Sequence, residues 1–322
     1  MKLATIRRDN GSEGVAAVLP ESDCVIDLSL NYRNRYRSDY SPFHSMLDVI
    51  KVADDALPVA QELLGAESIE RQKLSSTRLL APIPRPPQIR DFSVFPQHLI
   101  GAPRGMARLA NRLAGGPPSA EVPPGPLPEV YRNQPVFYFS NRFNVVGPDA
   151  EIRWPSYSEH LDFELEVAMV IKDEVIDVSR HTASDHIFGY MIYNDFSARD
   201  AQYHEMRGML GPAKGKSFDT GNAFGPWIVT ADELTDPAQL SVEARVNGEK
   251  WCSGTTYGML HSFEAMIECA SRSETLYPGE IFGSGTIGGC CGLEMDRYLS
   301  PGQTIELDIA GIGVLRNHVG GR

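Results

Sequence analysis

The 322-residue chain is poor in cysteine, in basic residues and in long apolar runs. Its five cysteines are odd in number and show neither a disulfide framework nor the C-x-x-C spacing of a zinc site. The 30 basic residues are outnumbered by 42 acidic ones, and the net charge of −12 argues against a nucleic-acid surface. No stretch approaches the roughly 18 apolar residues of a membrane helix, and the first nine residues lack a signal-peptide pattern. We therefore expect a cytoplasmic protein without membrane or nucleic-acid partners.

Two domains fit the length and patterning of the chain. Apolar residues make up 42% of the sequence and charged residues 22%, as in an ordinary globular protein. Three short β-like runs, at 3–7, 14–19 and 24–28, precede a helical pattern at 42–64. The proline-rich segment 80–87 then favours an extended connector. We expect a small N-terminal α+β domain at 1–80 and a main domain at 81–322.

Beyond the connector the pattern is mostly β. Strand-like runs recur without regular alternation with helices, at 135–139, 164–171, 187–194, 227–230, 240–246 and 304–309. Helical periodicity is found at 105–113 and 259–271. Residues 115–129 are too rich in glycine and proline for a packed element, so we expect 98–135 to form a mobile cover or arm. The pattern predicts a β-rich α+β fold rather than a doubly wound sheet.

Two acidic residues interrupt an apolar run. Glu164 and Glu166 are two residues apart, so a β-strand would put both carboxylates on one face. Adjacent like charges cost free energy unless solvent or a cation lies between them, and the strand alone favours solvent. A hard cation needs further oxygen ligands. Asp195, at the end of a strand-like run, and Asp91, after the connector, could supply them, or could be ordinary cap and turn residues.

Other segments carry candidate polar groups. Arg199 and Gln202 would share one side of a helical turn, where they could bind a carboxylate or pair with surface acids. Lys216 lies in a glycine- and proline-rich loop that lacks P-loop spacing, and it could equally be solvated. His98 lies on the predicted cover, and Glu294, in a glycine-rich segment, is a candidate acid–base residue or a structural one.

Taken together, these segments resemble the fumarylacetoacetate hydrolase family over most of the chain, roughly residues 84–319. The resemblance is carried by motifs that occur in the family's order: Leu161–Glu166, Asn194–Asp200, Gly215–Phe218 with Gly225–Trp227, and Gly283–Thr286. Each motif is weak alone, and the shared order makes them specific together. The resemblance implies the family's mixed β-roll or sandwich for the C-terminal domain, and it implies a homodimer.

The resemblance also implies roles for individual residues. A divalent metal, Mg²⁺, Ca²⁺ or Mn²⁺, would be held by Asp91, Glu164, Glu166 and Asp195. The substrate would be contacted by Arg199, Gln202, Tyr138 and Thr286. Lys216 would stabilise negative charge that develops on the substrate. His98 would act as the general base for water, with Glu294 holding it in orientation.

We therefore expect a metal-dependent hydrolase that cleaves a C–C bond in a β-diketo acid such as fumarylacetoacetate or an acylpyruvate. A decarboxylase, isomerase, tautomerase or dehydratase of a keto or sugar acid could use the same metal site, because those reactions need no activated water. A non-catalytic protein that binds a small molecule is a third possibility. In each case the expected partner is a small keto acid.

Overall fold

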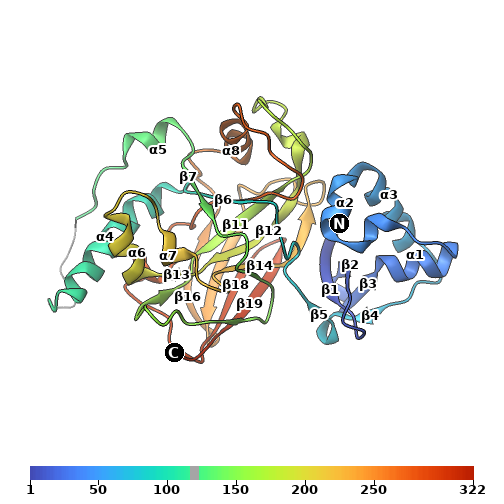
Figure 1. Ribbon diagram of the computed structural model, residues 1–322, viewed down its shortest axis with the longest axis horizontal. Coiled ribbons are helices and arrows are strands. Elements are labelled where there is room, and N and C mark those ends of the chain that lie inside the picture. The colour runs from blue at the N-terminus through green and yellow to red at the C-terminus, as the bar shows by residue number, and fades with distance from the viewer. Residues whose placement is uncertain (117–122) are drawn as a thin grey trace.

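A computed structural model describes residues 1–116 and 123–322. Its N-terminal unit, blue and on the right in Figure 1, combines five short antiparallel strands with three helices. The strands are β1 (Lys2–Arg7), β2 (Glu13–Leu19), β3 (Cys24–Asp27), β4 (Gln72–Lys73) and β5 (Arg78–Leu79). The helices are α1 (Leu28–Tyr36), α2 (Met46–Lys51) and α3 (Ala53–Leu64), with 3-10 turns at Pro20–Ser22, Ser41–His44 and Leu74–Ser76. The helical pattern predicted over 42–64 is thus divided, because the chain leaves helical geometry at Ser45 and again at Val52.

The main sheet runs through the whole described chain in the order β4-β3-β2-β1-β14-β12-β11-β17-β6-β7, with β5 beside β1 and β8 beside β14. Its further strands are β6 (Ile89–Phe92), β7 (Phe137–Ser140), β8 (Val145–Val146), β11 (Leu165–Ile171), β12 (Ile187–Asp195), β14 (Asn222–Thr230) and β17 (Ile281–Gly283). Every residue of β11, β12 and β14 is buried, which explains why these strands are apolar on both faces.

A second sheet packs against the first. It contains five strands in the order β16-β15-β18-β19-β9, namely β9 (Glu151–Ile152), β15 (Ser241–Val246), β16 (Glu249–Thr255), β18 (Thr304–Ile309) and β19 (Gly313–Val319). Side chains of both sheets, such as Val167 and Leu307, belong to one continuous buried cluster. A short antiparallel ladder joins β10 (Leu161–Asp162) to β13 (Ser197–Ala198), and it thereby pairs two of the motif segments noted in the sequence. The predicted mixed, strand-rich α+β fold is confirmed.

The N-terminal unit is joined to the rest through backbone pairing. β1 pairs antiparallel with β14, where Leu3 lies opposite Ile228. A second hydrophobic cluster contains Phe43 and Ile50 of this unit together with Met191 and Phe224 of the central strands. The unit therefore shares a sheet and a core with the remainder, and the boundary predicted near residue 80 stays a prediction.

The remaining helices lie around the central sheet (Figure 1). They are α4 (Pro96–Leu113), α5 (Glu129–Asn133), α6 (Arg199–Met206), α7 (Ala213–Lys216), α8 (Phe263–Ala270) and α9 (Gly292–Met295), with a 3-10 turn at Ala183–His186. Within the predicted cover, α4 and α5 are ordered elements, and residues 117–122 lie outside the described residues. In the part of the chain that is described, no helix has the length and apolar character needed to cross a membrane.

Candidate metal and catalytic site

Three buried carboxylates meet near the ends of three strands of the main sheet. Asp91 comes from β6, Glu166 from β11 and Asp195 from the end of β12. These strands are near neighbours in the order β12-β11-β17-β6, so sheet pairing brings together residues that are up to 104 positions apart (195 minus 91). One oxygen from each carboxylate lies within 4.8 Å of the others. Figure 1 shows the strands side by side at the centre of the molecule.

These three carboxylates each keep one oxygen without a hydrogen-bond partner: Asp91 Oδ1, Glu166 Oε1 and Asp195 Oδ1. Gly283 of β17 leaves the room for them, because a Cβ there would lie 2.6 Å from Asp91 Oδ1 and 2.8 Å from Glu166 Oε2. Buried acceptors without donors are rare, and buried charges are normally paired or bound to metal. The donor set of three converging oxygens therefore fits a hard divalent cation.

The pKa values of these buried carboxyl groups also indicate a cation site. Burial, reinforced by the charge of Asp195, raises the pKa of Asp91 well above its ordinary value. Burial and the charge of Asp91 do the same to the pKa of Glu166. Desolvation of each buried ion costs roughly several kcal/mol unless an opposite charge offsets it. If all three carboxylates are ionised, they carry three negative charges, and Lys216 beside Asp195 offsets only one of them. The remaining charge calls for a bound cation.

Glu164, the fourth predicted ligand, has a different environment. Its Oε1 lies 2.7 Å from Arg199 Nη2, and its Oε2 lies 2.5 Å from Lys216 Nζ. Burial acts to raise the pKa of Glu164, but the charges of Arg199 and Lys216 outweigh burial and hold that pKa below its ordinary value. Both oxygens are thus paired with protein cations, and a direct role of Glu164 as a metal ligand stays a prediction.

Arg199 lies among three other polar side chains. Its Nε donates to Asp162 Oδ2 at 2.7 Å, and its Nη1 donates to Gln202 Oε1 at 2.9 Å. Its third nitrogen, Nη2, lies 2.7 Å from Glu164 Oε1 in an ion pair without hydrogen-bond geometry, and the side chain is 1% exposed. The predicted pair Arg199 and Gln202 is therefore adjacent, while contact between Arg199 and a substrate stays a prediction.

Lys216 and Tyr138 both reach Asp195. Lys216 Nζ lies 2.5 Å from Asp195 Oδ2, and the Tyr138 hydroxyl donates to the same oxygen at 2.6 Å. Burial would lower the pKa of Lys216, but Asp195 and Glu164 raise it above its ordinary value, so the amine stays charged. The lysine links the paired carboxylate Glu164 to the three-acid cluster and puts positive charge beside both.

His98 and Glu294 form a hydrogen-bonded pair. His98 Nδ1 lies 2.6 Å from Glu294 Oε1, and the Gly289 amide donates to Glu294 Oε2 at 3.0 Å. The pair bridges α4 and α9, which pack closely because Gly101 faces Glu294: a Cβ there would lie 2.5 Å from its Oε2. Arg108 of α4 also donates to the Glu294 carbonyl at 2.9 Å. Two segments 196 residues apart thus hold one imidazole and one carboxylate.

Sequence reasoning passed over two residues of this region. Asp162 is fully buried and accepts hydrogen bonds from Arg199 and from the amides of Gly292 and Leu293, at 2.7 and 2.8 Å. Asp162 precedes Glu164 by two residues, so the same alternation that singled out the glutamates could have found it. Cys291 is also fully buried, with its Sγ 3.6 Å from Glu294 Oε1, and no sequence motif marked it.

Thr286, a predicted substrate contact, is 2% exposed and follows Gly285, whose amide donates to Glu166 Oε2 at 3.0 Å. Its backbone position thus adjoins the carboxylate cluster. A substrate contact of Thr286 stays a prediction.

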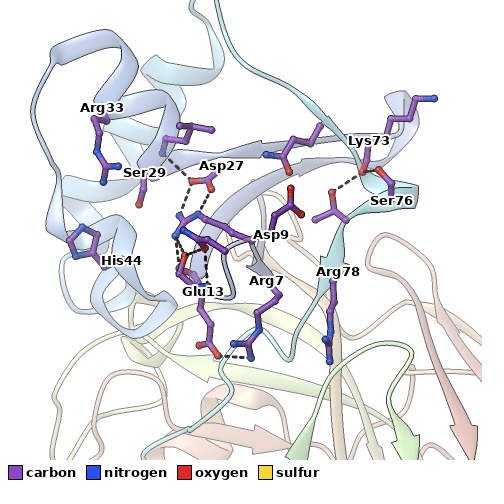
Figure 2. Close-up of a pocket in the computed structure, with 16 residues that line it drawn as sticks. Arg7, Asp9, Glu13, Asp27, Ser29, Arg33, His44, Lys73, Ser76 and Arg78 are labelled. Atoms are coloured by element: carbon purple, nitrogen blue, oxygen red, sulfur yellow. Dashed lines mark hydrogen bonds and ion pairs between the residues drawn. The ribbon is translucent and has the colours of Figure 1, made fainter.

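A cavity of about 990 Å³ lies elsewhere, in the N-terminal unit (Figure 2). Basic and acidic side chains line it together. Arg8 forms a two-pronged pair with Asp27, at 2.5 and 2.9 Å, and Arg7 pairs with Glu13 at 3.1 Å. Two of the basic residues are thus paired with acids, and among the described residues no side chain of this lining has a buried polar atom without a partner, so the candidate site is the carboxylate cluster.

Comparisons with known proteins agree with the fold and the motifs. Residues 116–320 match the family described as fumarylacetoacetate (FAA) hydrolase C-terminal. An oxaloacetate tautomerase of Bacillus subtilis is 32% identical over 248 residues, which cover 77% of this chain and 74% of that protein. A mitochondrial oxaloacetate tautomerase of Xenopus laevis is 30% identical over 316 residues, or 97% of this chain and 87% of that protein.

A solved structure extends the likeness to the whole chain. The fumarylacetoacetate hydrolase of Exiguobacterium antarcticum superposes with a TM-score of 0.72 at 27% identity, covering 100% of both chains. The family match spans well over half of the chain, and the Xenopus relative spans nearly all of it. The chain therefore belongs to the fumarylacetoacetate hydrolase family.

Proposed function

We propose that this protein is a divalent-metal-dependent hydrolase that cleaves a C–C bond in a β-diketo acid of the acylpyruvate or fumarylacetoacetate type. The single observation that carries the proposal is the His98–Glu294 pair, at 2.6 Å, in the same region as the three carboxylates with unpartnered oxygens. Hydrolysis needs both a group that binds the diketo acid and a base that activates water.

The metal would be held by Asp91, Glu166 and Asp195, which offer three oxygens to a hard cation such as Mg²⁺, Ca²⁺ or Mn²⁺. A bound cation would supply Lewis-acid polarisation of the substrate's carbonyl oxygens. Asp195 is itself anchored by Lys216 and Tyr138, so its remaining oxygen is held in a fixed direction.

The residues of the chain would carry the proton transfers. His98, oriented through Nδ1 by Glu294, would take a proton from water at Nε2 as the water oxygen attacks the carbonyl carbon. The attack forms a C–O bond, and the C–C bond then breaks with its electron pair leaving as an enolate. The charge of buried Lys216 would stabilise that enolate at lower cost than water could, because its position is already set.

Replacement of the base tests the proposal. His98→Asn and His98→Ala should lower kcat by about a hundredfold or more, since general base catalysis contributes about 10²–10⁴-fold. A panel of acylpyruvates and fumarylacetoacetate would be followed by loss of enol absorbance, with identification of both acid products. His181→Asn is a matched control, because His181 is exposed and lies outside the site.

The isotope readout separates hydrolysis from other reactions of the same substrates. In H₂¹⁸O, hydrolysis puts one labelled oxygen into the newly formed carboxylate, while the enolate product gains a proton. Unchanged turnover in His98→Asn, or cleavage without label, would remove His98 from the mechanism and with it the hydrolase proposal.

A second candidate is a keto–enol tautomerase of oxaloacetate. It is favoured by the two curated relatives, which carry that name at 30% and 32% identity. Tautomerisation moves one proton between carbon and oxygen and needs no attacking water. The same metal cluster would bind the substrate, and loss of oxaloacetate enol with deuterium entering at carbon and no cleavage would identify this activity.

A further inference from the structure

A second group of potential metal ligands lies beside the carboxylate cluster, and its chemistry is different. His98, Cys291 and Glu294 each offer one ligand atom, and these atoms all lie within 4.8 Å of one another. His98 Nδ1 is 2.6 Å from Glu294 Oε1, and Cys291 Sγ is 3.6 Å from the same oxygen. An imidazole nitrogen from α4, a carboxylate oxygen from α9 and a sulfur from the residue that precedes α9 thus converge.

This donor set suits a soft or borderline cation. Zinc is bound by Cys sulfur, His nitrogen and Asp or Glu oxygen at about 2.0–2.3 Å, and sites with three protein ligands keep a fourth position open. Thiolate ligands select against Mg²⁺ and Ca²⁺, which prefer oxygen alone. The two neighbouring groups therefore differ in the metals they discriminate: oxygen-only at Asp91, Glu166 and Asp195, and mixed nitrogen, sulfur and oxygen at the second group.

The backbone around the second group is fixed from several sides. Cys291 forms an antiparallel bridge with Glu164, and its neighbour Gly292 donates its amide to Asp162. On the other side, Arg108 of α4 donates to the carbonyls of Leu293 and Glu294, at 3.1 and 2.9 Å. The three ligand atoms are thus held close before any cation binds, which reduces the ordering cost of binding.

A cation can approach from the side of the histidine and the glutamate. The Cys291 residue is 0% exposed, whereas the side chains of His98 and Glu294 keep 12% and 10% of their surface exposed. The sulfur therefore forms the floor of the group, and the imidazole and carboxylate form its open side. Thiol reagents larger than a bare ion would reach this sulfur poorly.

We propose that His98, Cys291 and Glu294 form a second metal site that binds Zn²⁺ or Cd²⁺ and thereby inhibits the enzyme. On binding, the thiol proton is released to solvent, and the imidazole proton moves from Nδ1, which faces Glu294, to Nε2, so that Nδ1 can bind the metal. The inhibition rests on the proposed function, in which His98 Nε2 must accept a proton from water. The binding does not rest on it.

The test uses the Mg²⁺-saturated full-length protein titrated with Cd²⁺, whose bond to thiolate gives an ultraviolet charge-transfer band. Wild type should show one band per chain that Cys291→Ala removes. Cys269→Ser is the matched control, because Cys269 is a partly exposed cysteine outside the site, and it should leave the Cys291-dependent band unchanged. Glu294→Gln keeps the thiol and should weaken Cd²⁺ binding by more than about a hundredfold, which exceeds the cost of losing an outer-sphere partner.

Two outcomes contradict the binding site. A wild type without the band overturns it, and so does a band that survives Cys291→Ala, whichever other cysteine carries it. Glu294→Gln guards against misfolding of the cysteine variant, since an unchanged Cd²⁺ affinity there also counts against the site. Substrate turnover is measured in the same samples: a Cys291-dependent band in a protein without hydrolase activity would refute the proposed function and leave the metal site standing. A band without loss of activity would refute the inhibition.

Discussion

Two neighbouring groups of buried acids are neutralised in different ways. Asp162 and Glu164 are paired with the cations of Arg199 and Lys216, whereas Asp91 and Glu166 face each other with oxygens that no protein donor reaches. Both groups are buried to a similar degree, and Glu164 precedes Glu166 of β11 by only two residues. The comparison teaches that burial alone does not mark a metal site, and that the unpartnered oxygens do.

The largest effect is expected when the unpaired group loses a charge. Glu166→Gln should lower kcat/KM by at least about a thousandfold, because a bound metal contributes several kcal/mol and each 1.36 kcal/mol is tenfold in rate. Without metal, the same variant should unfold at the same or a higher temperature than wild type, since like-charge repulsion is relieved. A metal-free variant that melts well below wild type would show that the cluster was structurally paired after all.

A large loss of stability is expected when the paired group loses a partner. Asp162→Ala leaves Arg199 buried without its Nε acceptor, and such a break typically costs about 3–5 kcal/mol. Urea denaturation measures this free energy of unfolding. The control is Asp219→Ala, which removes an exposed pair with Arg153 and should cost about 0–1 kcal/mol. Equal costs for the two variants would contradict the distinction between buried and exposed pairs.

A smaller effect concerns acid stability at Asp200. Burial would raise the pKa of Asp200, but contact with His160, the Glu159 amide and the Ser158 hydroxyl lowers it below its ordinary value. Because the folded-state pKa is depressed, the carboxylate stabilises the fold above the unfolded pKa of about 3.9, and this is lost as pH falls through the folded pKa. Asp200→Asn should flatten the dependence of melting temperature on pH below about pH 4, and an unchanged slope would count against this account.

Much of the site could be predicted from the sequence. The period of a β-strand put Glu164 and Glu166 on one face, and Asp195 closes the neighbouring strand. What could not be predicted was which acids keep free oxygens, because the cations that pair with Glu164 come from residues 35 and 52 positions away, Arg199 and Lys216. The homodimer and the cytoplasmic location stay predictions.

The fold was predictable to a similar extent. The long central strands β11 and β12 follow apolar runs, whereas β17 has only three residues, too few for a periodic pattern. Helix α4 begins nine residues before the predicted segment 105–113. The sequence did not predict this first part of the helix because Gly101 and Pro103 have low helix propensity. Gly101 is required there by contact with Glu294, so packing against α9 overrides local preference.

The most direct test of the central claim is a thermal melt of metal-free protein with added Mg²⁺ or Mn²⁺. A cation at 100 times its Kd stabilises the native state by about 2.7 kcal/mol, so wild type should melt at a higher temperature with metal. The account predicts that Glu166→Gln loses this shift, and that Asp162→Asn keeps it from a lower starting temperature. A metal-dependent shift that persists in Glu166→Gln, or is absent from wild type, would contradict the claim that the unpartnered oxygens hold the cation.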